Sequence, residues 1–306
     1  MIRLVFALLL GLCAAPTGAQ TPVRHEFTQV HMGVPVRLVL HTADSTRARE
    51  GAQAAYGVIA ALDAALSDYR PDSELRRLEA STRRWSPVSD DLFVVLTRAV
   101  EIARATDGAF DPTTGALTRV WRAARATNTL PDSAAVRAAR QTVGWHHVLI
   151  DSSPRLLRVG SRGTQLDLGG IAKGYILQQA FDVLRALELR AVLLEAGGDI
   201  VVGDAPPGER GWGIMIGDST NVQFVTNVAV ATSGSRAQHL DVGAERYSHV
   251  IDPRTGWGVR ARTEVTVIAA DGATADAVAT ALSVLGAAQT DDVVRRNPAV
   301  ISVMWR

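Results

Sequence analysis

Apolar residues recur every three or four positions in several long segments of the chain, which is the period of one helical face. The longest segment follows Asp44 and Ser45, either of which can cap a helix, and its apolar positions end at Leu66. The other helices expected from this pattern lie near residues 89–108, up to Trp121, near 133–140, after Lys173 and over about 274–285.

Short apolar runs bounded by turn residues predict strands between these helices. The expected strands are residues 23–27, 36–41, 191–194, 212–216, 222–224, 228–232, 265–269 and 300–305, with two apolar segments around Val148 and Leu157. Residues 233–243 have a turn-prone composition. Because hairpins and helices are interleaved, the pattern favours an α+β fold over a regular βαβ repeat.

The first nineteen residues have the pattern of a secretory signal, with Arg3, an apolar stretch and a plausible cut after Ala19. We therefore expect export to the periplasm. Residues 20–306 would form a single domain, whether as one body or as two tightly packed lobes. Leu12 precedes Cys13 where a lipoprotein signal needs a small residue, so lipid anchoring is open but not favoured.

The composition and the absence of certain motifs argue against several kinds of site and partner. Cys13 is the only cysteine and would leave with the signal, so the mature chain would have neither a disulfide nor a thiol nucleophile. The 32 basic and 31 acidic residues nearly balance, which argues against a nucleic-acid partner held mainly by charge. The seven histidines lack a convincing zinc-ligand spacing, and the GxSxG, P-loop and GxGxxG motifs are absent.

The most specific stretch of the chain runs from residue 166 to residue 199. A short apolar strand is expected to end at Asp167, and Gly169 and Gly170 then lead to Lys173 at the start of a helix. Glycines allow close approach of a ligand to the backbone, and a lysine at a helix N-terminus suits a phosphate. The same spacing also fits ordinary tight turns with a solvated lysine, and taken alone it leaves both interpretations open.

Two further groups of residues carry possible chemistry. Asp276 and Thr280 lie four positions apart, hence on one helical face, where their oxygens suit Mg²⁺; helix capping and a buried threonine explain the pair equally simply. His249 ends a strand before a Pro-Gly turn and would serve as a base, or would simply pair with a carboxylate. Loop residues with side chains suited either to flank a flat ring or to pack in the core are Met32, Tyr69, Phe110 and Trp257.

Seven motifs occur in an order and spacing that resemble the ApbE family, the FAD:protein FMN transferases. They are SDYRPDSEL, GAFDPTTGAL, LDLGGIAKGY, the GGD turn, VATSG, SHVIDPRTG and TADAVATALSVLG. The resemblance extends from about Met32 to Gly286. It implies a core of antiparallel strands similar to a T-fold, with flanking helices.

The resemblance also implies a reaction and its residues. The enzyme would use Mg²⁺ to transfer FMN from FAD to a Ser or Thr hydroxyl of a target flavoprotein and release AMP. The Gly170 carbonyl, Asp276 and Thr280 resemble the metal ligands, and His249 resembles the residue that helps to deprotonate the acceptor. Lys173 would act with the metal on the phosphoryl oxygens. The positions similar to those that line the FAD site are Met32, Tyr69, Ala109, Phe110, Asp111, Asp167, Lys173 and Ile251.

The expected acceptor is a flavoprotein subunit of an electron-transfer complex, which carries a segment similar to D-[GS]-x-[ST]-[GSA]-[AT]-T. This chain has no obvious copy of that segment, so the acceptor should be another protein. Glu195 stands before the GGD turn where the family commonly has Asn, which puts the acceptor groove in question. Two alternatives remain open, namely an Mg²⁺-dependent pyrophosphatase that splits FAD to FMN and AMP, and a non-catalytic periplasmic flavin-binding protein.

Overall fold

The structure is a computed structural model that describes residues 21–153, 155–216, 222–234, 239–243 and 245–306. Seven strands form its central sheet in the order β1-β2-β6-β7-β10-β13-β14. Every neighbouring pair in this sheet is antiparallel. The strands are β1 (Val23–His31), β2 (Val34–Thr42), β6 (Val192–Ala196), β7 (Asp199–Val202), β10 (Val228–Gly234), β13 (Glu264–Ala269) and β14 (Val300–Trp305).

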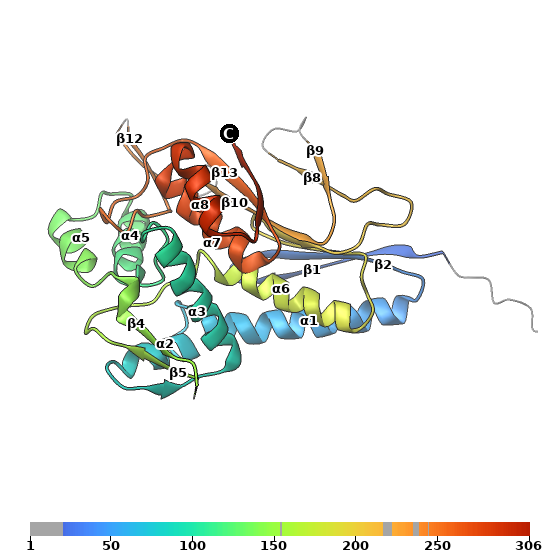
Figure 1. Ribbon diagram of the computed structural model, residues 1–306, viewed down its shortest axis with the longest axis horizontal. Coiled ribbons are helices and arrows are strands. Elements are labelled where there is room, and N and C mark those ends of the chain that lie inside the picture. The colour runs from blue at the N-terminus through green and yellow to red at the C-terminus, as the bar shows by residue number, and fades with distance from the viewer. Residues whose placement is uncertain (1–20, 154, 217–221, 235–238, 244) are drawn as a thin grey trace, which may run out of the picture.

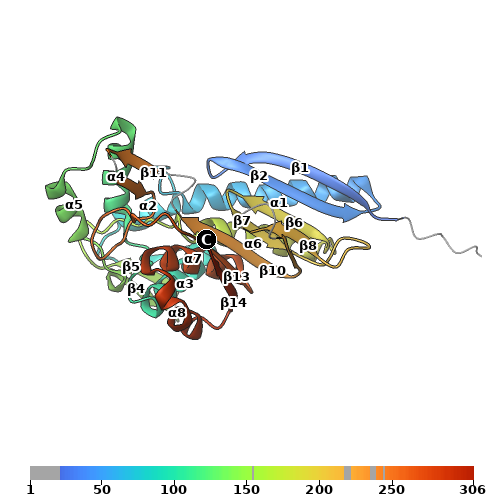
Figure 2. The same ribbon diagram turned by 90° about the horizontal axis from the view of Figure 1, so that it is seen from above.

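Three helices cover one face of this sheet. Figure 2 views the sheet from its other face, so that the strands lie in front of these helices. They are α1 (Ser45–Leu66), α6 (Ala172–Ala186) and α7 (Gly272–Leu285). Their apolar stripes form the main core with alternate strand residues such as Leu38. The intervening residues, such as Val39, face the other side of the sheet, where the hairpin of β8 (Trp212–Met215) and β9 (Val222–Val225) lies.

The remaining elements gather at one end of the sheet (Figure 1). The helices are α2 (Glu74–Ala80), α3 (Asp90–Ala105), α4 (Gly115–Thr127), α5 (Ser133–Arg140) and α8 (Thr290–Arg296), with short 3₁₀ turns at Trp145–His147 and Ala287–Gln289. A small sheet contains β3 (Ser86–Pro87), β4 (Val148–Asp151) and β5 (Leu156–Val159), and a hairpin contains β11 (His239–Val242) and β12 (Glu245–Ser248). Trp121 of α4 donates to the Gly256 carbonyl at 2.9 Å, and the chain around β12 packs with it in an apolar cluster.

This architecture confirms the predicted α+β class of antiparallel strands with flanking helices. Asp44 caps α1 by accepting from the Thr46 N–H at 2.8 Å, and α5 and β14 have the predicted bounds. The prediction of a strand that ends at Asp167 is wrong. This segment forms only an isolated β-bridge, between Gln165 and Thr114.

Short elements were harder to predict. Residues 239–242 of the turn-prone stretch form β11, whereas residues 235–238 lie outside the described part of the chain. β7, with 4 residues, and α8, with 7 residues, were not expected. Only Val293 of α8 is buried, so that helix shows no apolar period. The predicted signal and Cys13 also lie outside the described residues.

Within the described residues, no helix is both long enough and apolar enough to cross a bilayer.

Candidate active site

Two glycines let helices α6 and α7 meet backbone to backbone. A Cβ atom added to Gly174 of α6 would lie 2.0 Å from the carbonyl oxygen of Gly272 in α7, so no side chain fits there. The Gly174 N–H consequently reaches Asp276, and donates to its Oδ2 at 3.3 Å. Asp271 caps α7 by accepting from the Thr274 N–H at 2.8 Å. The cap and the glycine contact together place the start of α7 against the first turns of α6.

The glycine pair before α6 lies against the same face of α7. A Cβ atom added to Gly170 would lie 2.9 Å from Thr280 Oγ1 and 3.4 Å from a ring carbon of Phe110. Thr280 follows Asp276 by one helical turn, as the spacing predicted. The structure therefore brings together the three residues expected to bind a metal, and their role as ligands stays a prediction.

Lys173 lies between two buried carboxylates at this helix contact. Its Nζ atom donates to Asp199 Oδ2 and lies 3.9 Å from Asp276 Oδ2. Asp199 begins β7 directly after the second glycine pair, and its side chain is 5% exposed. Sequence reasoning did not identify Asp199 as a site residue, although the GGD motif offered a signal. A carboxylate that starts a strand after a glycine turn is well placed to face an approaching helix.

The buried charges perturb one another strongly. Burial and, secondarily, the Asp199 charge raise the pKa of Asp276 to about 7, against the opposing effects of Lys173 and the Gly174 N–H. Burial also raises the pKa of Asp199, against the opposing effect of Lys173. For Lys173 burial acts to lower the pKa, but the two carboxylates outweigh it and leave the pKa raised. Lys173 therefore stays protonated near neutral pH, and Asp276 readily takes up a proton.

The donors present here fit a hard divalent cation. A carboxylate and a hydroxyl one turn apart, beside a glycine backbone, offer the oxygen ligands that Mg²⁺ prefers. Among the described residues, no three His, Cys, Asp or Glu side chains are placed to hold a metal together. A cation at Asp276 would therefore depend on backbone, hydroxyl, water and substrate oxygens, which is usual for Mg²⁺ bound with phosphates.

Asp111 and Asp167 are the two carboxylates among the residues expected to line the FAD site, and both accept hydrogen bonds that hold loops in place. Asp167 accepts from the Gly169 N–H at 2.7 Å through Oδ1 and from the Thr118 hydroxyl at 2.5 Å through Oδ2. Asp111 accepts from the Thr113 N–H at 2.8 Å, and burial raises its pKa. These bonds shape the segments that precede α4 and α6, and contacts of either carboxylate with FAD stay predictions.

The remaining predicted FAD-site residues have varied surroundings. Ala109 and Phe110 are buried in the main core, whereas Tyr69 is 75% exposed. Met32 has φ of 53° at the turn between β1 and β2 and packs against the main core. Ile251 belongs to the apolar cluster around Trp121.

Two residues considered for catalysis or ring binding lie near this cluster. His249 is half-buried directly after β12, on the segment that packs against α4. Its role as a base stays a prediction. Trp257 is edge-on to Trp121, with ring centroids 5.7 Å apart, so its observed contact is one of core packing.

The unusual Glu195 lies away from the lysine site. It accepts from Arg37 Nε at 2.9 Å and from Nη2 at 2.6 Å, and the two residues are register partners across β2 and β6. Because side chains alternate along β6, Glu195 is on the face of Leu193, whereas its neighbour Leu194 faces the helices. Its carboxylate is therefore matched by a local cation on the outer face of the sheet.

Comparison with known proteins assigns this arrangement to a family. The model of the ApbE family matches residues 32–305. The chain belongs to the ApbE family. The FAD:protein FMN transferase of Chlamydia trachomatis is 31% identical over 286 residues, which cover 90% of this chain and 87% of that protein. The FAD:protein FMN transferase of Klebsiella pneumoniae is 30% identical over 313 residues, with 95% and 89% covered.

Solved ApbE structures share the fold. The ApbE protein of Thermotoga maritima superimposes with a TM-score of 0.81 at 29% identity and covers 92% of this chain and 93% of its own. The flavin transferase ApbE of Vibrio cholerae gives a TM-score of 0.80 at 27% identity, with 93% of each chain covered. The ApbE fold therefore extends over nearly all of the described chain.

Proposed function

We propose that the protein transfers FMN from FAD to a Ser or Thr hydroxyl of a target flavoprotein and releases AMP, with Mg²⁺ bound at Asp276, Thr280 and the Gly170 carbonyl. The observation that carries this proposal is the meeting of Gly170, Lys173, Asp276 and Thr280 where α6 and α7 touch. The FAD:protein FMN transferase name of its relatives supports the choice of substrate.

The reaction exchanges one P–O bond for another. The acceptor hydroxyl oxygen attacks the phosphorus of the FMN half, and the pyrophosphate P–O bond breaks so that AMP leaves. Bound Mg²⁺ would supply positive charge to the phosphate oxygens. Lys173 adds a second positive charge that Asp199 holds in position, and His249 accepts the proton of the acceptor hydroxyl.

The proposed acceptor is a flavoprotein subunit of an electron-transfer complex on the outer side of the cytoplasmic membrane. The signal-like first nineteen residues support this location. Its test is fractionation of the producing cell, with the mature N-terminus read by mass spectrometry. Retention of residues 1–19 on a cytoplasmic protein would contradict export.

The mature protein should be incubated with FAD, Mg²⁺ and an acceptor that carries the segment D-[GS]-x-[ST]-[GSA]-[AT]-T. The acceptor should gain one FMN mass, and one AMP should be released per adduct. An acceptor with Ala in place of the modified Thr should remain unmodified, because it lacks the attacking hydroxyl. Release of FMN and AMP without an adduct would instead establish the pyrophosphatase. FAD that binds but is not consumed would establish the flavin-binding protein.

Mg²⁺ affinity should depend on pH because the cation must displace the proton that Asp276 holds below its pKa of about 7. Affinity should rise by about tenfold per pH unit up to about pH 7 and then level off. Without Mg²⁺, the stabilisation that comes from the raised pKa is present below the unfolded value near 3.8 and is lost as pH rises through about 7.

Isothermal titration of Mg²⁺ in buffers of different ionisation enthalpy would count the protons released at each pH. Thr280→Val should weaken binding but keep the same pH slope, since Asp276 remains. A pH-independent affinity from about pH 5.5 to 8 would contradict a metal at Asp276.

A further inference from the structure

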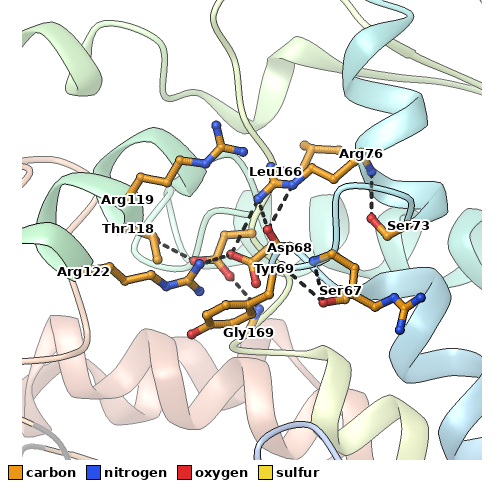
Figure 3. A network of polar contacts seen from close by, with 12 residues as sticks. Ser67, Asp68, Tyr69, Ser73, Arg76, Thr118, Arg119, Arg122, Leu166 and Gly169 are labelled. Atoms are coloured by element: carbon orange, nitrogen blue, oxygen red, sulfur yellow. Dashed lines mark hydrogen bonds and ion pairs between the residues drawn. The ribbon is translucent and has the colours of Figure 1, made fainter. Parts of the chain in front are cut away.

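An exposed aromatic ring and a tethered arginine are stacked beside the loop that leads to Lys173. The guanidinium carbon of Arg122 lies 3.8 Å from the centroid of the Tyr69 ring. Tyr69 is nevertheless 75% exposed. Figure 3 shows Arg122 reaching from α4 toward Asp68, close to the ring of Tyr69. The tyrosine thus has a guanidinium on its ring while most of its side chain remains open to solvent.

Arg122 is held rigidly by a buried partner. Its Nη1 atom donates to Asp68 Oδ2 at 2.5 Å, and the Asp68 side chain is 9% exposed. The Asp68 carbonyl oxygen in turn accepts from Arg76 Nε at 3.0 Å. Burial and the nearby charge of Asp167 raise the pKa of Asp68, whereas the Arg122 hydrogen bond lowers it. Because an ion pair this enclosed is costly to break, Arg122 cannot readily leave the tyrosine ring.

A second arginine, one turn further along α4, has a donor to spare. Arg125 Nη1 is buried and has no hydrogen-bond partner among the described residues. Burial lowers the pKa of Arg125, and the charge of Arg122 lowers it further because the two guanidinium groups lie near each other on α4. An unpaired buried donor costs about 1–3 kcal/mol, a cost that an acceptor atom on a ligand would remove.

We propose that Arg122 is a positioning residue that holds Tyr69 as a flat surface for a heteroaromatic ring of FAD, and that Arg125 donates to an acceptor atom of that ring. The proposal rests on the proposed binding of FAD and adds two arginines to it. A tyrosine with a cation on one face and a ring on the other gains from both stacking interactions. Isoalloxazine and adenine share the required chemistry, since each is planar and carries nitrogen or oxygen acceptors.

If Arg122 acts by positioning Tyr69, then replacing Arg122 should weaken FAD binding only while Tyr69 is present. A merely structural role for Arg122 would weaken FAD binding whether or not Tyr69 is present. The binding energies of wild type, Tyr69→Leu, Arg122→Gln and the double variant form a thermodynamic cycle. Each single variant should weaken FAD binding by about tenfold, and the double variant should bind about as weakly as Tyr69→Leu alone. KM for FAD should rise while kcat changes little.

The controls separate stacking from charge. Arg119→Gln removes the same charge from the preceding turn of α4, where Arg119 lies 3.7 Å from Glu79, and should leave FAD affinity unchanged. Arg122→Lys keeps the charge without the planar group, so it should recover only part of the affinity. It also serves as the test variant if Arg122→Gln does not fold.

Arg125→Met gives an independent readout. Removing the unpaired donor should raise the thermal unfolding midpoint of the ligand-free protein and weaken FAD binding at the same time. A structural arginine would show the opposite change in stability, and a variant that is destabilised with unchanged FAD affinity would refute the role of Arg125.

Titrations with FMN and with ADP would identify the ring. Loss of affinity in Tyr69→Leu and Arg122→Gln confined to FMN would place isoalloxazine on Tyr69, and loss confined to ADP would place adenine there. Equal losses from Arg122→Gln in the presence and absence of Tyr69 would overturn the proposal. Absence of FAD binding by the wild type would instead overturn the proposed function itself.

Discussion

Replacing Asp276 with alanine should lower kcat/KM for FMN transfer by about a thousandfold or more without unfolding the protein. The carboxylate is the one charged ligand among the residues proposed to bind Mg²⁺. Its pKa of about 7 records how unfavourable its charge is in this buried position. Because Lys173 keeps its bond to Asp199, removing Asp276 leaves no unpaired charge. The metal-free variant should therefore unfold at the same temperature as the wild type or above it.

The neighbouring threonine provides a matched pair of variants. Thr280→Ser keeps the hydroxyl and should retain most activity, whereas Thr280→Val keeps the shape but loses the oxygen ligand. Raising the Mg²⁺ concentration should partly restore Thr280→Val and should not restore Asp276→Ala. Steady-state assays across Mg²⁺ concentrations would measure this, and wild-type rates for Asp276→Ala would remove the metal from the proposed site.

Local pattern was sufficient to predict most of the fold. The apolar stripe of α1 and its Asp44 cap are local features, as is the apolar run of β14. Two of the elements that were missed, β11 and α8, lack such a pattern. β11 has a burial pattern with only one buried residue, and α8 likewise buries only Val293, so neither shows a periodic apolar face.

The candidate site divides in the same way. A spacing of four residues is enough to place Asp276 and Thr280 on one face of a helix. The bond from Lys173 to Asp199 and the stack of Arg122 on Tyr69 join separate elements, so no local spacing specifies them. Asp167 also illustrates the limit. Its Oδ2 accepts from Thr118 of α4, a contact between separate segments that no local spacing specifies, and its contact with FAD stays a prediction.

Asp199→Ala should destabilise the metal-free protein, whereas Asp276→Ala should not, although both aspartates are buried beside the same lysine. The Lys173 side chain is only 29% exposed, and without Asp199 it would lose its direct hydrogen-bond partner. Leaving one member of a buried ion pair alone should cost about 3–5 kcal/mol of unfolding free energy. The ammonium would then move toward Asp276, now 3.9 Å away, and compete there with Mg²⁺. Both stability and Mg²⁺ affinity should therefore fall.

Urea unfolding of the metal-free variants would measure this contrast directly. Replacing both partners, in Lys173→Met with Asp199→Leu, should recover much of the stability because no charge is left unpaired, although transfer should stay lost without the lysine. Asp199→Asn keeps the shape and a hydrogen-bond acceptor, so it should fall between wild type and Asp199→Ala. Equal unfolding free energies for wild type and Asp199→Ala would mean that Asp276 alone can hold Lys173.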